Sequence, residues 1–162
     1  MPRPANRSPR ILDPFDRAIL RLIQHDNKMP QRRIAEAVNL SAAAVQRRIA
    51  AMEEAGVIAR NVALVDPAAV PLTITSIVEV RLPNERVDTV DAAKALFQGT
   101  PEVQQCYYVT GGISFVLVIV TSDMRAYEAL TRRLFAENGY IESYRSLIAL
   151  DRIKVDTSIV IP

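Results

Sequence analysis

The sequence predicts an α+β fold of two domains: a helical N-terminal domain and a C-terminal β-α-β-β-α-β sandwich of the ferredoxin-like type. Apolar residues recur at helical spacing up to Gly56. Segments rich in β-branched residues alternate with helical patterns after Pro71. Asp66-Pro67 and Pro71 mark a break between these regions. The expected boundaries are a tail over 1–10, a first domain over 11–65, a linker over 66–72 and a second domain over 73–162.

Three helices are predicted between residues 11 and 56. Asp13 caps the first, whose opening position is the favourable Pro14. The second starts at Pro30 and ends at Asn39-Leu40, where asparagine accepts the left-handed conformation of a tight turn. Ser41 caps the third, which runs from 42 to about 55 and stops at Gly56. Two short helices joined by such a turn form a helix-turn-helix.

Residues 57–65 are predicted to form two short strands around Arg60-Asn61, a β-wing that makes the first domain a winged helix-turn-helix. The segment before the first helix, residues 1–10, holds three prolines and three arginines and no apolar periodicity. We expect it to be a disordered basic tail.

The second domain is predicted to contain four strands and two helices. Thr110-Gly111-Gly112 provides a hairpin turn, because glycine accepts positive φ. One face of the sheet is covered by the helices, and the other needs a partner subunit. Candidate residues for that open face are Tyr107, Tyr108, Phe115 and Val116. The strands are expected over 73–82, 103–109, 113–121 and 143–155, and the helices around 87–97 and 127–134.

The composition favours a globular, soluble, cytoplasmic protein with no membrane segment: 49% of residues are apolar, and no apolar run approaches the roughly 20 residues that span a bilayer. The only cysteine is Cys106 and the only histidine is His25. No internal disulfide, metal site or Ser-His-Asp set can be assembled from them. We therefore expect no catalytic residues, no enzyme activity and no cofactor.

The charges and the third helix together point to double-stranded DNA as a partner. Residues 1–65 carry a net charge of +5, whereas residues 66–162 carry −3. With Val45, Ile49 and Met52 turned inward, the helix turns Ala42, Ala43, Gln46, Arg47 and Ala50 outward. Small residues admit a helix to the major groove, glutamine pairs with adenine and arginine with guanine. The alternative is a helical bundle with a solvated charged face.

Flanking residues complete the expected DNA interface. Arg32, Arg33 and Arg48 are predicted to contact phosphates beside the recognition helix. Arg60, at the tip of the predicted wing, is expected to reach the DNA backbone. Ser41 lies at the start of the recognition helix and belongs to the same surface.

An ordered set of short motifs resembles the Lrp/AsnC family, also called feast/famine regulators, over about residues 11–160. In the first half the matching pieces are the run Leu12–Leu20, Ile34-Ala35, Leu40-Ser41, Val45, Arg48-Ile49, Met52-Glu53, Gly56-Val57-Ile58 and Asp66-Pro67. In the second half they are Pro101-Glu102-Val103, Cys106, Val109-Thr110-Gly111, Asp123-Met124, Tyr127 and Lys154. The resemblance implies homodimers, often assembled into octamers, that are regulated by amino acids or related metabolites bound at subunit contacts.

The resemblance places an effector near Val109, Thr110, Gly111, Gly112 and Ser114. The family usually has a carboxylate where this chain has Ser114, and a neutral serine cannot offer an ammonium group the same charge-assisted bond. The nature of the effector, and whether there is one, stays open on this evidence. Two alternatives are a metabolite-binding protein without DNA activity and an enzyme similar to tetrapyrrole decarboxylases. The latter use histidines in the second domain, which has none here.

Overall fold

A computed structural model describes residues 10–67 and 69–162 and divides into two compact units. The first unit comprises the chain up to Leu64 together with residues 155–162, and the second comprises residues 65–154. The sequence placed residues 155–162 in the second domain, whereas in the structure they contact the first unit. The expected disordered tail lies outside the described residues, apart from Arg10.

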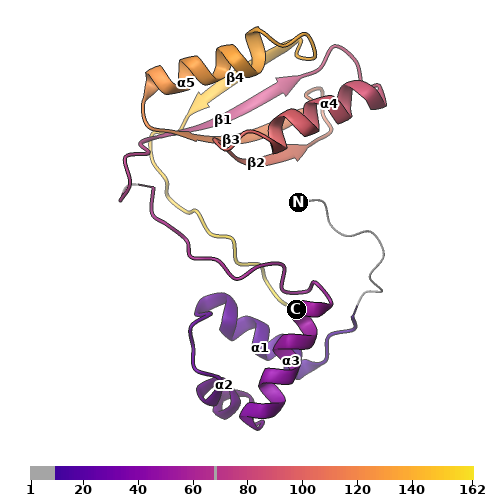
Figure 1. Ribbon diagram of the computed structural model, residues 1–162, viewed down its shortest axis with the longest axis vertical. Coiled ribbons are helices and arrows are strands. Elements are labelled where there is room, and N and C mark those ends of the chain that lie inside the picture. The colour runs from indigo at the N-terminus through magenta and orange to yellow at the C-terminus, as the bar shows by residue number, and fades with distance from the viewer. Residues whose placement is uncertain (1–9, 68) are drawn as a thin grey trace. The chain divides into compact units, whose positions relative to one another are not determined.

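The first unit consists of three helices around a small core (Figure 1). They are α1 (Pro14–His25), α2 (Gln31–Val38) and α3 (Ala42–Glu54). The buried residues of the core are Ile19, Leu20, Ile34, Ala35, Val38, Val45 and Met52. This core takes its members from all three helices, so it fixes the direction of the solvent-facing side of α3.

Local signals in the sequence set the ends of these helices. The Asp13 carboxylate accepts a hydrogen bond from the Asp16 backbone N–H at 2.8 Å. The Ser41 hydroxyl does the same for Ala44 N–H at 3.2 Å. Asn39 has φ 57° and ψ 46°, the left-handed conformation that ends α2 and turns the chain toward α3. The predicted caps and turn are confirmed.

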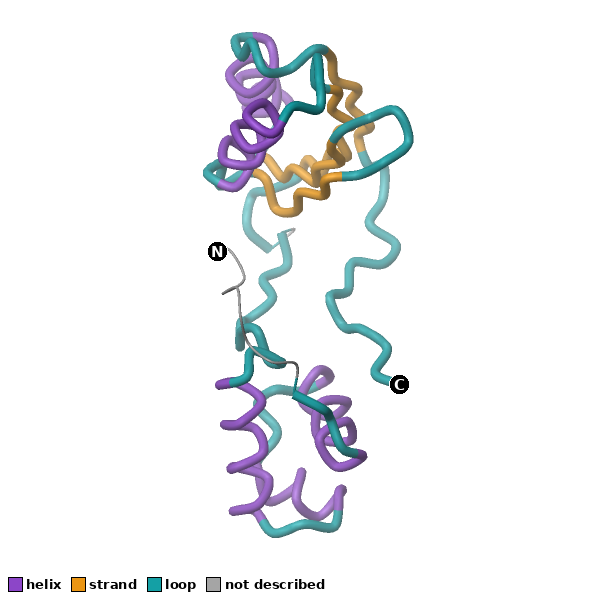
Figure 2. Tube along the Cα trace, turned by 90° about the vertical axis from the view of Figure 1, so that its right-hand side faces the viewer, coloured by secondary structure: helices purple, strands orange, loops and turns teal. Residues whose placement is uncertain are grey.

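The predicted wing strands are not present. Residues 57–65 form no strand, and Figure 2 draws them as loop. The favoured two-residue hairpin turns need positive φ at their first central position, which arginine disfavours at position 60. An isolated two-stranded hairpin is also marginal in water. Asn61 instead donates a side-chain hydrogen bond to Glu53 at 2.8 Å, which holds this segment near the end of α3.

The second unit has the predicted β-α-β-β-α-β order. Its strands pair antiparallel in the order β2-β3-β1-β4, which confirms the ferredoxin-like fold class. The final strand ends at Ile148, well before the predicted residue 155. The elements are β1 (Ile74–Arg81), α4 (Val87–Gln98), β2 (Val103–Tyr108), β3 (Phe115–Thr121), α5 (Met124–Thr131), a short π-helix η1 (Arg132–Ala136) and β4 (Ser143–Ile148).

The two faces of this sheet differ in what covers them. Both α4 and α5 lie on one face (Figure 1), over sheet side chains such as Val80, Phe115 and Leu117 that are fully buried. The opposite face carries Ile77 paired with Val118 on one side and with Leu147 on the other. No helix in the described ranges is long and apolar enough to cross a bilayer.

Two of the predicted open-face residues were assigned to the wrong side. Phe115 is 0% exposed and packs against Phe97 with ring centroids 5.3 Å apart. Tyr108 is half exposed, but its ring contacts Phe115 at 5.1 Å, on the side of the helices. Alternation along a strand explains both, because Tyr107 and Val116 then point to the other face.

Candidate nucleic-acid interface and effector loop

The solvent-facing side of α3 is built as the sequence predicted. Val45 and Met52 are 0% exposed and anchor the helix in the core. Ser41, Ala42, Ala43, Gln46 and Arg47 are all exposed. The residues at the N-terminal end of this face are small, so a flat surface precedes the longer Gln46 and Arg47 side chains.

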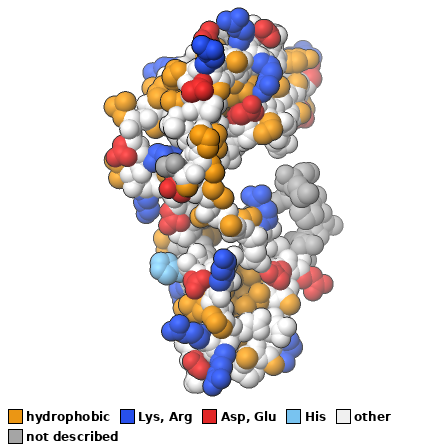
Figure 3. All heavy atoms as spheres, turned by 60° about the vertical axis from the view of Figure 1, so that its left-hand side comes forward, with side chains coloured by type: hydrophobic (Ala, Val, Ile, Leu, Met, Phe, Trp, Pro, Cys, Tyr) orange, Lys and Arg blue, Asp and Glu red, His pale blue; other side chains and the backbone are white. Residues whose placement is uncertain are grey.

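The four arginines that were predicted to bind phosphates differ in what surrounds them. Arg32 and Arg33 lie exposed in the first turn of α2, where Arg32 forms a loose ion pair with Glu36 at 3.4 Å. Arg60 is exposed in the segment after α3. In the view of Figure 3, the basic side chains of the helical unit are separated by uncharged ones and do not form one continuous patch.

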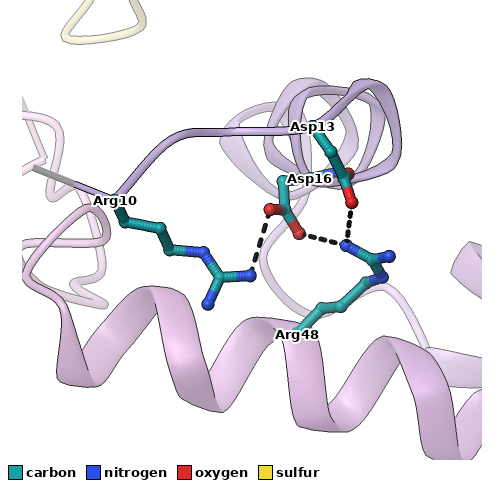
Figure 4. A network of polar contacts seen from close by, with 4 residues as sticks. All are labelled: Arg10, Asp13, Asp16 and Arg48. Atoms are coloured by element: carbon teal, nitrogen blue, oxygen red, sulfur yellow. Dashed lines mark hydrogen bonds and ion pairs between the residues drawn. The ribbon is translucent and has the colours of Figure 1, made fainter.

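Arg48 has a different environment, because it belongs to a network of charges between α1 and α3 (Figure 4). Its Nη1 donates to Asp13 at 2.7 Å and to Asp16 at 2.8 Å. Arg10 donates to the other oxygen of Asp16 at 3.0 Å. The Asp16 side chain is 2% exposed, so it is a buried carboxylate bound by two guanidinium groups. The Arg48 guanidinium also lies 5.5 Å from the centre of the Phe15 ring.

This network gives Arg48 a structural role. The hydrogen bonds to Asp16 and then Asp13 raise the pKa of Arg48. The backbone N–H of Asp16, more than the Arg48 side chain, lowers the pKa of the Asp13 carboxyl. With two carboxylates bound, Arg48 has little positive charge to offer a phosphate. Its contacts therefore do not support the expected role in DNA binding, and we assign it instead to joining the two helices.

A hollow of about 390 Å³ lies beside the exposed face of α3. Four residues of α3 line it, among them the short Ala44 and Ala51 and the longer Arg47. Its lining residues are Arg10, Leu40, Ala44, Arg47, Arg48 and Ala51. The short side chain of Ala51 leaves this side of the helix open.

The predicted effector loop, residues 109–114, is attached to a carboxylate that the sequence analysis did not identify. Ser114 is 2% exposed, accepts a hydrogen bond from Leu82 N–H at 3.1 Å and donates one to Glu85 at 2.6 Å. Tyr108 donates to the other Glu85 oxygen at 2.6 Å. These two hydroxyl groups, Ser114 first, lower the pKa of Glu85, which keeps this exposed carboxylate ionised.

The rest of the loop is open to solvent. Gly111 and Gly112 have φ of 110° and 90°, conformations that side chains rarely adopt, so the turn needs both glycines. A Cβ atom placed at Gly111 would contact nothing within 4 Å, and one at Gly112 would lie 3.9 Å from the Arg81 guanidinium. Val109 is half-buried and Thr110 is exposed. An anion (Glu85) and a cation (Arg81) thus border the same turn.

Comparison with known proteins identifies both units. The family model described as Lrp/AsnC ligand binding domain matches residues 75–159, more than half of the chain. A model described as winged helix-turn-helix DNA-binding matches residues 12–59. The chain belongs to the Lrp/AsnC family of transcriptional regulators.

Individual Lrp/AsnC relatives match over nearly the full chain. An uncharacterised HTH-type transcriptional regulator of Sinorhizobium fredii is 41% identical over 143 residues, which cover 88% of this chain and 85% of the relative. The crystal structure of an AsnC family regulator from Agrobacterium tumefaciens is 34% identical, has a TM-score of 0.86 and covers 92% of this chain and 97% of its own. A Neisseria meningitidis regulator solved in complex with L-methionine is 26% identical, with a TM-score of 0.86 and coverage of 93% and 97%.

These findings confirm the expected family and establish the protein as a DNA-binding, helix-turn-helix transcriptional regulator of the Lrp/AsnC type. The site residues within it stay predictions. Among the residues that sequence reasoning missed, Asp16 lies in the first turn of α1, where the positive helix end already accounts for an acidic residue. Glu85 stood in a polar loop with no motif around it, so the sequence carried no signal for its contact with Ser114.

Proposed function

We propose that the protein acts as a homodimer that presents two α3 helices to successive major-groove faces of a pseudo-palindromic operator. Gln46 and Arg47 read base edges, and Ala42 and Ala43 allow the close approach. Arg32, Arg33 and Arg60 hold phosphates. The observation that carries this proposal is the exposed face of α3, with its small residues followed by Gln46 and Arg47, opposite the buried Val45 and Met52.

The uncovered face of the sheet supports the homodimer. Ile77, Val118 and Leu147 adjoin one another across three strands, and Leu147 is 46% exposed. Beside them, Arg145 forms a bidentate ion pair with Glu79 at 2.8 and 2.9 Å. An apolar strip with a polar border is the composition of a subunit interface. The dimers assemble further, to the octamer that the family resemblance implies, and work in the cytoplasm without a cofactor or catalytic activity.

An amino acid or related metabolite is the proposed effector, bound at the 109–114 loop. The Neisseria relative binds L-methionine, and the Lrp/AsnC ligand binding domain spans this loop. Ser114 removes the expected carboxylate from the loop, but Glu85 supplies an ionised one beside it. Glu85 would receive the ammonium group of the effector, and Arg81 its carboxylate. The effector alters DNA binding only if it binds two states of the protein differently.

Fluorescence anisotropy tests the DNA proposal directly. The purified protein is titrated on DNA from upstream of its own gene and on scrambled DNA, at two salt concentrations. We expect a preference of about a thousandfold or more, and an affinity that falls as salt rises. Equal, weak binding to both would mean that this DNA is not the target or that an effector is needed. No binding at all would favour the metabolite-binding alternative.

Two arginine variants separate base contact from helix packing. Arg47→Ala should weaken binding to the specific site by about 1–3 kcal/mol and relax its base preference, with no loss of stability. Arg48→Ala should lower the stability of the first unit, because it leaves Asp16 with Arg10 alone, and leave the base preference of the folded molecules unchanged. Equal weakening of Arg47→Ala on random DNA would make Arg47 a phosphate contact.

A further inference from the structure

The last eight described residues, 155–162, are attached to the helical core of the first unit. The chain passes from the first unit to the second after Leu64 and returns to the first after Lys154. In Figure 1 the yellow end of the chain, marked C, lies beside the helices of the first unit. Residues 155–162 have no regular secondary structure, so their backbone groups are left for side chains or water to satisfy.

Three side chains on one face of α1 bind this segment. Gln24 pairs with the backbone of Ile159 in both directions, accepting from its N–H at 2.9 Å and donating to its carbonyl at 3.1 Å. Arg21 donates through Nε and Nη2 to the Ile161 carbonyl at 3.2 and 3.0 Å. Arg17 donates to the Pro162 carbonyl at 3.2 Å. The spacing i, i+4, i+7 places the three donors along one stripe of the helix.

An apolar contact accompanies these polar ones. Ile161 is partly buried and packs against the core of the first unit, whereas its neighbours Ile159 and Val160 are 72% and 95% exposed. A hollow of about 310 Å³ remains between the segment and the end of α1. The segment is therefore held by the Ile161 side chain and by its backbone groups. Together these contacts fix its register along α1.

We infer that residues 155–162 are a clasp that gives the DNA-binding unit a second connection to the rest of the protomer and thereby restrains its motion. A unit held by one flexible linker explores a large volume. Once one recognition helix of a dimer has bound its half-site, the other helix is therefore present at a low effective concentration near the second half-site. A second connection reduces that volume and raises the effective concentration. The functional consequence of this inference rests on the proposed DNA binding by a dimer. The contact between the segment and α1 does not depend on that proposal.

Variants on both sides of the contact test the clasp. Gln24→Ala removes both bonds to Ile159 and places a good helix former in α1. Ile159→Pro removes the bonded N–H from the segment. Gln98→Ala is the matched control, since it makes the same change at an exposed helical position of the second unit. Binding is measured on DNA with two half-sites and on DNA with one.

We expect Gln24→Ala and Ile159→Pro each to weaken binding to DNA with two half-sites by roughly tenfold and to leave binding to a single half-site unchanged. The double variant should bind two half-sites no more weakly than either single variant, because both changes break the same contact. Equal weakening on both DNAs would overturn the inference, because the segment would then only support the fold of α1. Unchanged binding to both would also overturn it.

A measurement without DNA keeps the clasp separate from the proposed function. Nitrogen-15 relaxation reports how fast the first unit tumbles. We expect shorter correlation times for the first unit in Gln24→Ala and Ile159→Pro than in the wild type and Gln98→Ala. If the wild type bound no DNA, the proposed function would fail. The relaxation result would still show whether residues 155–162 restrain the first unit. Identical tumbling in all four proteins would refute it.

Discussion

Replacing Asp16 with alanine should destabilise the first unit more than any surface change. The variant leaves Arg10 without its ion-pair partner and leaves Arg48 with Asp13 alone, at 2.7 Å. Breaking a buried pair costs about 3–5 kcal/mol. Arg48 keeps one partner and the Arg10 side chain is 29% exposed, so we expect about 3 kcal/mol, the low end of that range. A unit of this size has a total stability of roughly 4–11 kcal/mol.

Hydrogen exchange followed by mass spectrometry measures this loss separately in each unit. A cost of about 3 kcal/mol corresponds to exchange in α1 and α3 that is roughly a hundredfold faster, with α4 and α5 unchanged. Glu36→Ala is the control, because it deletes an exposed carboxylate paired with Arg32 at 3.4 Å and should cost less than about 0.5 kcal/mol. If Asp16→Ala and Glu36→Ala changed exchange in α1 and α3 equally, the buried network would not be what holds these helices together.

Three further outcomes follow from the contacts described. The pKa of Asp13 is lowered in the folded state, so its contribution to stability is complete above the unfolded value of about 3.8 and is lost as the pH falls through the lower folded-state pKa. Acid titration of the helical signal should therefore show unfolding that is less acid-sensitive in Asp13→Asn. Glu85→Gln should abolish the rise in melting temperature that an amino-acid effector produces in a screen of all twenty, and a rise equal to that of the wild type would remove Glu85 from the site. Val118→Lys should convert dimers to monomers in light scattering, whereas a dimer of unchanged mass would place the interface elsewhere.

Elements encoded by neighbouring residues were predictable from the sequence. Asn39 and Ser41 each determine the backbone within three residues of their own position, so the turn before α3 and its cap could be located in advance. The stripe formed by Val45 and Met52 fixed which side of α3 faces solvent. The exposed recognition face could be predicted from this stripe alone, because the direction of each side chain on a single helix follows from the helical period.

Contacts between distant residues could not be predicted in the same way. Arg48 lies 32 positions from Asp16, and nothing in either local sequence distinguishes a buried ion pair from a phosphate contact. Glu85 bonds Ser114 across 29 positions. For Phe115 the face was predicted wrongly because the register of β3 was unknown, and a shift of one residue reverses the two faces.

The path of the chain also sets when the DNA-binding unit is complete during synthesis. Its three helices are made first, but residues 155–162 are needed to cover α1. At about 5–20 residues per second, the ribosome reaches them roughly 5–20 s after Leu64. The stripe of Arg17, Arg21 and Gln24 stays uncovered throughout this interval, while the second unit is being made. The recognition domain is therefore complete only once the chain that follows its helices has been synthesised, although those helices come first in the sequence.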